Sequence, residues 1–360
     1  MAYICSTGVG IPENNLSQQR IKELVKGIFP SNNRLDRLMP VFDNAKVHNR
    51  QFVVDQEWFN ENHSFQESNN LYQHFAQKYA LEAIDHCLGN NQFLSKDIPY
   101  EAIDMIIFVS STGIATPSID AHLLNKRPFR TDINRMPLWG LGCAGGAIGL
   151  SRTFDWIKAN SDKMALIICC ELCSLTFQKD DVKKSNVIGS ALFGDGVGAA
   201  LVVGENSNFF SYRKKTVPKI TATSSLTKKN STNVMGWEVT HGGLEVIFSK
   251  SIPALVNTFW NEHINSFLYE NELTEERIHS FIAHPGGKKV LEAMEEVLQS
   301  PKQKLSKSYK VLANHGNMSS ATVFYVLYEW MNESISKGER SILSALGPGF
   351  SSELILMEWT

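Results

Sequence analysis

The stretch "MPLWGLGCAGGAIGL" (residues 136–150) places one cysteine, Cys143, between glycines at the point where an apolar run becomes a helix. A thiol at a helix N-terminus faces unpaired backbone N–H groups and the positive end of the helix dipole, which favour the thiolate. The glycines beside it let a substrate carbonyl approach the backbone, whose N–H groups can stabilise an oxyanion. Two interpretations stay open at this point, a nucleophile and a buried structural cysteine.

The pattern around Cys143 recurs in the second half of the chain. The strand-like runs are 103–113, 164–171 and 197–205 in the first half, and 278–287, 341–349 and 352–359 in the second. Ile103 precedes Cys143 by 40 residues, and Ile278 precedes Asn317, where the matching helix is expected to start, by 39. Strand–helix–strand order with continuous apolar runs predicts a duplicated, layered α/β fold. The polar region 206–233 separates the halves, which we place at 1–212 and 213–360.

A histidine and an asparagine lie at the corresponding positions of the second half. His284 follows a strand in "AHPGG", where an imidazole can hold a thiolate as an ion pair and donate to a developing negative oxygen. Asn317 begins "GNMSSA" and can bind an enolate without protonating it. The alternatives are a structural histidine and a helix N-cap. His315, on the glycine turn before the helix, competes with His284 for the histidine role.

Composition excludes several classes of function. The chain has 360 residues, 43% of them hydrophobic and 20% charged, and a formal net charge of −2, which gives no general electrostatic case for nucleic acid or an anionic membrane. No apolar run is long enough for a transmembrane helix, and the N-terminus does not resemble a secretory signal. Cys170 and Cys173 have C-x-x-C spacing, but they end a strand-like run and lack both distant Cys or His partners and a thioredoxin-like context, which argues against a zinc or redox site. We therefore expect a metal-free, reduced, cytoplasmic enzyme.

Five motifs together carry a resemblance to a known family. They are "GCAGG" around Cys143, "ALFGDGVGAA" (191–200), "HPGG" (284–287), "NHGNMSSA" (314–321) and "ALGPG" (345–349). In this order they resemble the type III polyketide synthases, the chalcone and stilbene synthase family of the thiolase fold. The resemblance implies two pseudo-symmetric βαβαβαββ halves in a five-layered αβαβα arrangement, a homodimer, and acyl-CoA and malonyl-CoA as substrates without any cofactor. It also implies that Cys143 carries the acyl group while His284 and Asn317 assist decarboxylation of malonyl-CoA.

The resemblance extends to the substrate chamber. Phe193 matches an aromatic gatekeeper between the coenzyme A tunnel and the chamber, although a core aromatic is the alternative. Val246 falls at the second gatekeeper, where the family has phenylalanine, so we expect a wider passage unless Phe248 fills the space. Ser319, in "GNMSSA", is also assigned to the chamber.

Departures from the plant enzymes concern the choice of starter. "GCAGG" is one residue shorter than the usual "GCFAGG" and lacks its aromatic residue. Cys173 and Thr176 occupy chamber positions where threonines are usual, and Thr116 falls where the plant enzymes project a methionine across the dimer interface. These changes favour an apolar aliphatic starter, so the chain resembles bacterial members that make long-chain alkylpyrones or alkylresorcinols.

A basic segment aligns with the tunnel mouth that binds coenzyme A phosphates. It is "RLDRLMPVFDNAKVHNRQF" (34–52), and its candidate phosphate ligands are Arg34, Arg37, Lys46 and Arg50. A solvated surface helix is the alternative interpretation of the same spacing.

Two other functions remain open from the sequence. The first is a single condensation, as in ketoacyl synthase III or hydroxymethylglutaryl-CoA synthase, which also use a cysteine and a histidine. The second, of another class, is a non-catalytic thiolase-fold protein that only binds acyl-CoA or a partner.

Overall fold

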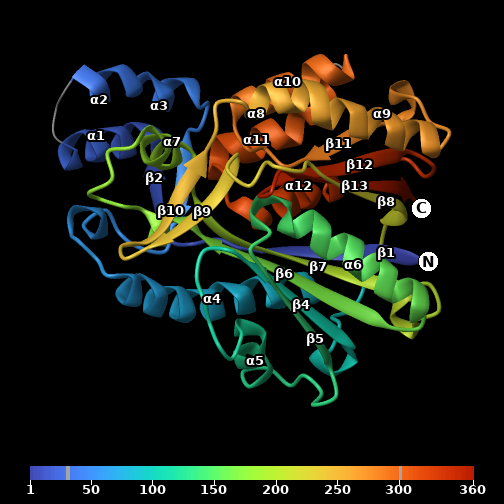
Figure 1. The fold of residues 1–360 in the computed structure, drawn as a ribbon. Coiled ribbons are helices and arrows are strands. Elements are labelled where there is room, and N and C mark those ends of the chain that lie inside the picture. Colours follow the sequence, from blue (N-terminus) through green and yellow to red (C-terminus); the bar gives the residue numbers. More distant parts are fainter. Residues whose placement is uncertain (30–32, 300–301) are drawn as a thin grey trace.

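The structure is a computed structural model that describes residues 1–29, 33–299 and 302–360 (Figure 1). The side chains of residues 33 and 34 also lie outside the described part of the chain. Strands from both halves form one nine-stranded mixed sheet in the order β11-β12-β13-β8-β1-β7-β6-β4-β5.

The N-terminal half contributes five strands to this sheet. They are β1 (Ala2–Gly10), β4 (Met105–Ser110), β5 (Asn134–Trp139), β6 (Met164–Leu172) and β7 (Asp195–Gly204). β4 runs parallel to both β5 and β6, while β7 is antiparallel to β6 and β1. The strand predicted at 103–113 is shorter than expected, since β4 spans only Met105–Ser110.

The C-terminal half repeats this arrangement. Its strands are β8 (Pro218–Thr227), β11 (Ser280–Ala283), β12 (Arg340–Gly347) and β13 (Ser351–Trp359). β11 and β12 are parallel, and β13 is antiparallel to β12 and β8, in the same order as their counterparts. Within the described residues this half has no counterpart of β5. The prediction of two pseudo-symmetric halves is confirmed, with one strand fewer in the second.

The halves meet along β1 and β8, where Ala2 pairs with Ile220 and Tyr3 with Lys219. β8 lies inside the polar region 206–233, which the sequence analysis treated only as a boundary. The predicted boundary between residues 212 and 213 falls in the connection that leads into β8 and stays a prediction.

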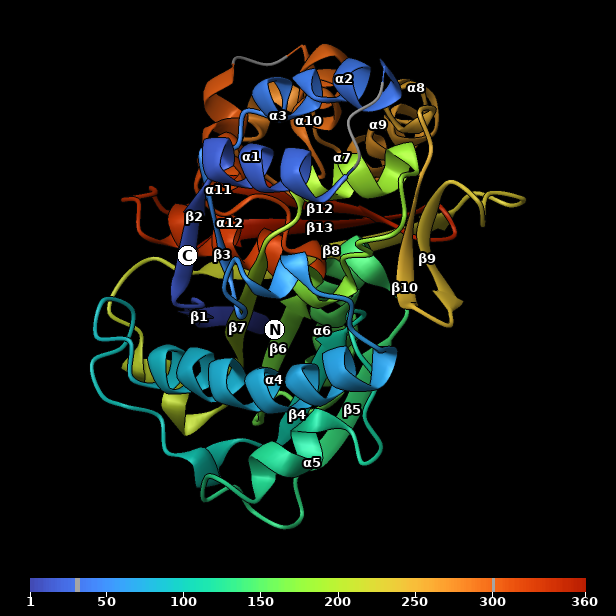
Figure 2. The ribbon, with the colours of Figure 1, turned by 90° about the vertical axis from the view of Figure 1, so that its left-hand side faces the viewer.

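Two buried helices lie between the two parts of the sheet and carry the residues of the site. α6 (Gly145–Ala159) and α12 (Thr322–Met331) each contact strands of both halves. Val323 to Leu327 are all buried, so α12 is apolar on every side, as expected of a central helix. α4 (Phe65–Leu88) covers the outer face of the N-terminal strands, while α9 (Asn261–Glu270), α10 (Lys288–Leu298) and α11 (Ser306–His315) cover the other outer face. Figure 2 shows the resulting five layers, αβαβα.

The remaining elements surround one end of the two central helices or lie at the periphery. The helices are α1 (Gln18–Ile28), α2 (Asn33–Leu38), α3 (Pro40–Asn44), α5 (Ile119–Leu124), α7 (Lys184–Leu192) and α8 (Ile252–Leu255). The strands are β2 (Asn14–Ser17), β3 (Asn49–Phe52), β9 (Met235–Thr240) and β10 (Gly243–Phe248). Short turns of helix are η1 (Trp58–Asn60), η2 (Tyr100–Ala102), η3 (Gly142–Ala144), η4 (Cys173–Thr176), η5 (Asn208–Tyr212), η6 (Val256–Trp260), η7 (Glu275–Arg277), η8 (Lys302–Leu305) and η9 (Ser319–Ala321).

Candidate active site

Cys143 lies on the turn η3 that leads into α6. Gly142 before it adopts a φ of +49°, and a β-carbon there would lie 2.7 Å from the ring of Pro348, so only glycine fits this turn. The Gly142 N–H donates to Ser111 Oγ at 2.9 Å, which fixes the turn against the end of β4. Of the six cysteines, all within the described ranges, five are buried and Cys143 is partly exposed.

Asn317 meets Cys143 at the start of the second central helix. The Cys143 Sγ is 4.0 Å from Asn317 Oδ1. That oxygen accepts the Ser319 N–H at 2.8 Å, and Asn317 Nδ2 donates to the Gly286 carbonyl at 3.3 Å. Ser319 has a φ of +45°, an uncommon value for a serine, which turns its N–H back towards the amide. The amide of Asn317 is therefore held by both of its ends.

His284 follows β11 and is buried, with 3% of its surface exposed. Among the described residues, neither of its ring nitrogens has a hydrogen-bond partner. A β-carbon added at Gly286 would lie 3.8 Å from its Nε2, and the Gly286 carbonyl is the group that Asn317 contacts. The structure thus gathers His284, Asn317 and Cys143, which come from the two halves of the chain, around Gly286 and the turn η3.

The rival histidine has another role. His315 Nδ1 is 2.7 Å from Gln51 Oε1, and its ring packs edge-on against Tyr325 at 5.0 Å between centroids. A histidine with these partners connects β3 to the end of α11. His284 therefore remains the candidate for the histidine of the site.

Burial dominates the electrostatics of the site. It raises the pKa of the Cys143 thiol to about 12, although hydrogen bonds with Ser319 and Asn317 oppose the shift. Burial also lowers the pKa of His284 to about 3. Desolvation therefore acts against the pair of thiolate and imidazolium that the sequence predicts, and this pair stays a prediction.

Glu171 is a buried acid that the sequence analysis missed. It lies on β6 and accepts hydrogen bonds from the Ser111 N–H at 3.0 Å, the Thr112 hydroxyl at 3.0 Å and the Ser320 hydroxyl at 2.6 Å. Burial raises its pKa to about 7, and its charge contributes to the raised pKa of Cys143. A single charged residue near the end of the apolar run "MALIICCEL" was the available signal.

Phe193 and the hairpin of β9 and β10 cover a hollow beside Cys143. The hollow is lined by Gly142, Cys143, Phe193, Met235, Gly236, Trp237, Val246, Ile247, Phe248, Ser319 and Pro348. The ring of Phe193 lies 5.5 Å from Phe248 and 5.6 Å from Trp237. Phe248 therefore stacks on the ring of Phe193, the first gatekeeper, beside the smaller Val246 at the second gatekeeper position. Trp237 is a wall residue that no sequence motif indicated.

A second, apolar hollow lies beside the first. The two share Phe193, Trp237 and Val246. Cys173 and Thr176, both assigned to the chamber, line the second hollow rather than the one that contains Cys143. Its other apolar lining residues are Leu16, Ile21, Leu24, Val25, Phe52, Phe59 and Phe177.

Arg50, one of the predicted phosphate ligands, is placed elsewhere. Only 1% of its surface is exposed, and its guanidinium donates to the Phe193 carbonyl at 2.6 Å and to Gln18 Oε1 at 2.7 Å. Its assignment to a coenzyme A phosphate is wrong, because the group is closed off from solvent. It braces the turn of Phe193 instead, together with Asp195, which accepts the Val53 N–H at 2.8 Å.

The other predicted phosphate ligands and Thr116 lie on the surface. Arg37 on α2 is exposed, and exposed Lys46 follows α3 beside a shallow pocket. The side chain of Arg34 lies outside the described residues. Thr116 is exposed on a loop that lines neither hollow.

Comparison with known proteins identifies the family. The family model described as "Chalcone and stilbene synthases, N-terminal domain" matches residues 1–207, and the family model of the C-terminal domain matches residues 220–359. A Bacillus subtilis protein named "Putative chalcone synthase" is 44% identical, covering 100% of this chain and 99% of the relative. A 1,3,6,8-tetrahydroxynaphthalene synthase of Streptomyces peucetius is 31% identical, covering 99% of this chain and 93% of the relative.

A solved structure agrees with these matches. The crystal structure of 1,3,6,8-tetrahydroxynaphthalene synthase from Streptomyces coelicolor, a bacterial type III polyketide synthase, superimposes with a TM-score of 0.92 at 26% identity and covers 99% of both chains. The fold and the site define a condensing enzyme of the thiolase fold. Within that class, the chain belongs to the chalcone and stilbene synthase family and is a type III polyketide synthase.

Family membership establishes the type of reaction. The enzyme is an acyltransferase that performs decarboxylative condensation with malonyl-CoA, and it acts on coenzyme A thioesters without a cofactor. Within residues 1–29, 33–299 and 302–360, no three His, Cys, Asp or Glu side chains are grouped so that they could hold a metal ion. No helix in the same ranges has the length and hydropathy needed to cross a membrane.

Proposed function

We propose that the enzyme loads a long-chain fatty acyl group onto Cys143, extends it with malonyl-CoA and cyclises the product to an alkylpyrone or alkylresorcinol. The apolar hollow that lies beside the Cys143 chamber, on the other side of Phe193, carries this proposal. Much of its lining is aliphatic and aromatic, from Leu16 and α1 to Phe59. A saturated chain gains free energy from every methylene buried there, about 0.8 kcal/mol each.

The three site residues act in sequence. As the acyl group transfers to Cys143 Sγ, the thiol proton moves to the unpartnered imidazole of His284, and the coenzyme A thiolate leaves. Malonyl-CoA then loses CO2, and the oxygen of the resulting enolate accepts hydrogen bonds from Asn317 Nδ2 and the His284 ring. The enolate carbon attacks the acyl carbonyl, and Cys143 Sγ is the leaving group.

The supporting geometry is local to each residue. His284 has no partner among the described residues that would compete with substrate. The Asn317 amide is oriented by Ser319 and Gly286, so a hydrogen-bond donor is held in place before substrate binds. With Arg50 excluded, Arg37 and Lys46 are the described residues that we retain for the coenzyme A phosphates, next to Arg34.

We propose two further properties. The enzyme acts as a homodimer through the edge strand β5, since Trp139 and Ile114 expose 53% and 42% of their surfaces there, and Thr116 is exposed on the same loop. A cytoplasmic location accords with six free cysteines, which a reducing compartment preserves.

The test is a product assay with purified protein, malonyl-CoA and a series of acyl-CoA starters from about C2 to C18, read by mass spectrometry. Long saturated starters are expected to yield tri- and tetraketide pyrones or resorcinols. Exclusive use of aromatic starters would contradict the proposed substrate, and a single β-ketoacyl thioester would favour the one-round condensing alternative.

Variants separate the roles of the residues. Cys143→Ala is expected to abolish acyl loading seen in the intact mass, whereas Cys87→Ala, a buried thiol on α4, keeps it. Asn317→Ala is expected to load normally and lose decarboxylation. His284→Ala is expected to lose condensation while His315→Ala retains it. A wild-type protein that binds acyl-CoA and never labels at Cys143 would support the non-catalytic alternative.

A further inference from the structure

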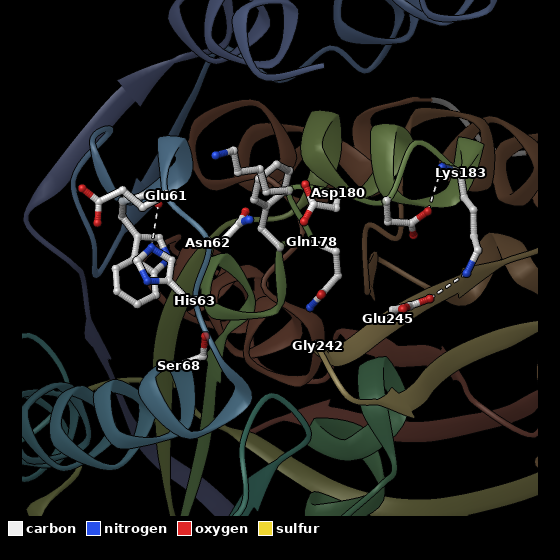
Figure 3. Close-up of a pocket in the computed structure, with 13 residues that line it drawn as sticks. Glu61, Asn62, His63, Ser68, Gln178, Asp180, Lys183, Gly242 and Glu245 are labelled. Atoms are coloured by element: carbon white, nitrogen blue, oxygen red, sulfur yellow. Dashed lines mark hydrogen bonds and ion pairs between the residues drawn. The ribbon is translucent and has the colours of Figure 1, made fainter. Parts of the chain in front are cut away.

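A polar hollow lies next to the apolar one. It lies between η1, the loop before α7 and the hairpin of β9 and β10. Figure 3 shows Glu61, His63, Asp180 and Glu245 around it, with the ion pair of Lys183 and Glu245, 2.6 Å long, at one side. Charged and amide groups dominate this lining, so it offers little to a hydrocarbon chain.

One side chain separates the polar hollow from the apolar one. Phe177 lines both, while its neighbour Thr176 lines only the apolar hollow and Gln178 only the polar one. The ring of Phe177 lies 5.5 Å from that of Phe59 and 6.1 Å from that of Phe29. The rings of Phe177, Phe59 and Phe29 therefore close the apolar hollow on the side that faces the polar one.

We propose that Phe177 is the end wall of the acyl channel and sets the longest acyl chain that the enzyme accepts. The inference rests on the proposed function and adds a residue that determines specificity. A chain that extends from Cys143 past Phe193 into the apolar hollow gains about fourfold in binding for each methylene buried before the wall. Beyond Phe177 a further methylene must displace the ring and then lie among Glu61, Asp180 and Glu245, where that gain ends.

The test compares variants of Phe177 with a matched control. Phe177→Ala and Phe177→Leu shorten the wall, and Phe177→Trp thickens it. Phe75→Ala is the control, because Phe75 is also a partly buried phenylalanine packed against the same core and lines neither hollow. Each protein is given an even-numbered series of saturated acyl-CoA starters, with and without malonyl-CoA, and read by intact mass at Cys143 and by product mass.

In the wild type, kcat/KM for loading is expected to rise with chain length and then level off. Phe177→Ala should move the chain length at which kcat/KM levels off to longer chains, by at least two carbons. Phe177→Leu should move it in the same direction by no more than Phe177→Ala does. Phe75→Ala should leave it unchanged. Phe177→Trp should move it to shorter chains; where this variant does not fold, the alanine and leucine variants decide. An unchanged levelling point in a folded Phe177→Ala protein that still loads would overturn the inference and leave the proposed function intact. A wild type that loads no fatty acyl group would overturn the proposed function first.

Discussion

At Cys143 two physical effects act on the thiol in opposite directions. The N-terminus of α6 stabilises a thiolate by about 0.3–1 kcal/mol. Burial acts the other way and raises the thiol pKa from 9.0 to about 12, a difference of roughly 4 kcal/mol. Desolvation is the larger of the two effects and favours the neutral thiol. In the proposed mechanism, the nucleophile forms as the proton passes to His284 during acyl transfer.

This balance predicts the pH dependence of alkylation. A thiol whose pKa is raised to about 12 has a small thiolate fraction at neutral pH, and that fraction grows about tenfold per pH unit. The rate of iodoacetamide labelling at Cys143 is therefore expected to rise steadily from about pH 7 to pH 9 without a plateau. Peptide mass spectrometry measures the labelled fraction, and Cys143→Ala gives the background. A rate that is already constant near pH 7 would show a thiolate–imidazolium pair in the resting enzyme.

At the scale of elements, the site depends on how closely α6 and the turn before α12 approach each other. A β-carbon on Gly146 would lie 2.5 Å from the Ser320 carbonyl oxygen and 2.9 Å from Val323 Cγ1. The nearer atom belongs to the backbone of η9, so it cannot swing away. The last glycine of "GCAGG", Gly146, thus permits the helix contact that brings Cys143 to Asn317.

The approach of these two elements predicts opposite responses from two glycines of the same helix. Gly146→Ala is expected to lower the free energy of unfolding by about 1–3 kcal/mol, because the added methyl group overpacks the crossing. A β-carbon on Gly149 would have its nearest neighbours at 3.4 Å. Gly149→Ala is therefore expected to be neutral or to gain up to about 1 kcal/mol from helix propensity. Denaturant titration measures both, and equal effects would refute this account of the crossing.

At the scale of the whole molecule, the nine-stranded sheet ends in an exposed edge. In the described part of the chain β5 pairs only with β4, and its outer side carries exposed Trp139 and Pro137. Unprotected edges of this kind are completed by another chain or blocked. The proposed homodimer places a second copy there.

This proposal predicts the effect of a charge on the edge. Trp139→Lys is expected to convert a wild-type dimer to a monomer, since the lysine must be desolvated when two edges meet. Tyr269→Lys is the control, because Tyr269 is an aromatic residue with 85% exposure on α9. Sedimentation velocity distinguishes the two states. A Trp139→Lys protein that sediments with the wild-type dimer would exclude β5 as the interface.

The features that the sequence determined by itself are local ones. Continuous apolar runs indicated the buried strands, because both faces of these strands are covered by helices. Glycines around Cys143, the strand end at His284 and the helix start at Asn317 placed three reactive side chains at ends of elements. The equal spacing of the two halves then predicted that these ends face one another. β8 escaped detection because most of its outer part is half-exposed and rich in Ser, Thr and Lys.

The tertiary structure decided what depends on distant segments packing together. Arg50 reads as a surface cation within its own basic segment, and only the contacts with Gln18 and the Phe193 carbonyl bury it. In the sequence, Glu171 is only a charged residue at the end of a strand. The hydrogen bonds from Ser111 and Ser320, which are distant in sequence, form only in the folded protein. Trp237 and Phe177 have no motif at all. Their roles as walls arise because a hollow is defined by the residues that surround it, and those come from segments that sequence order does not bring together.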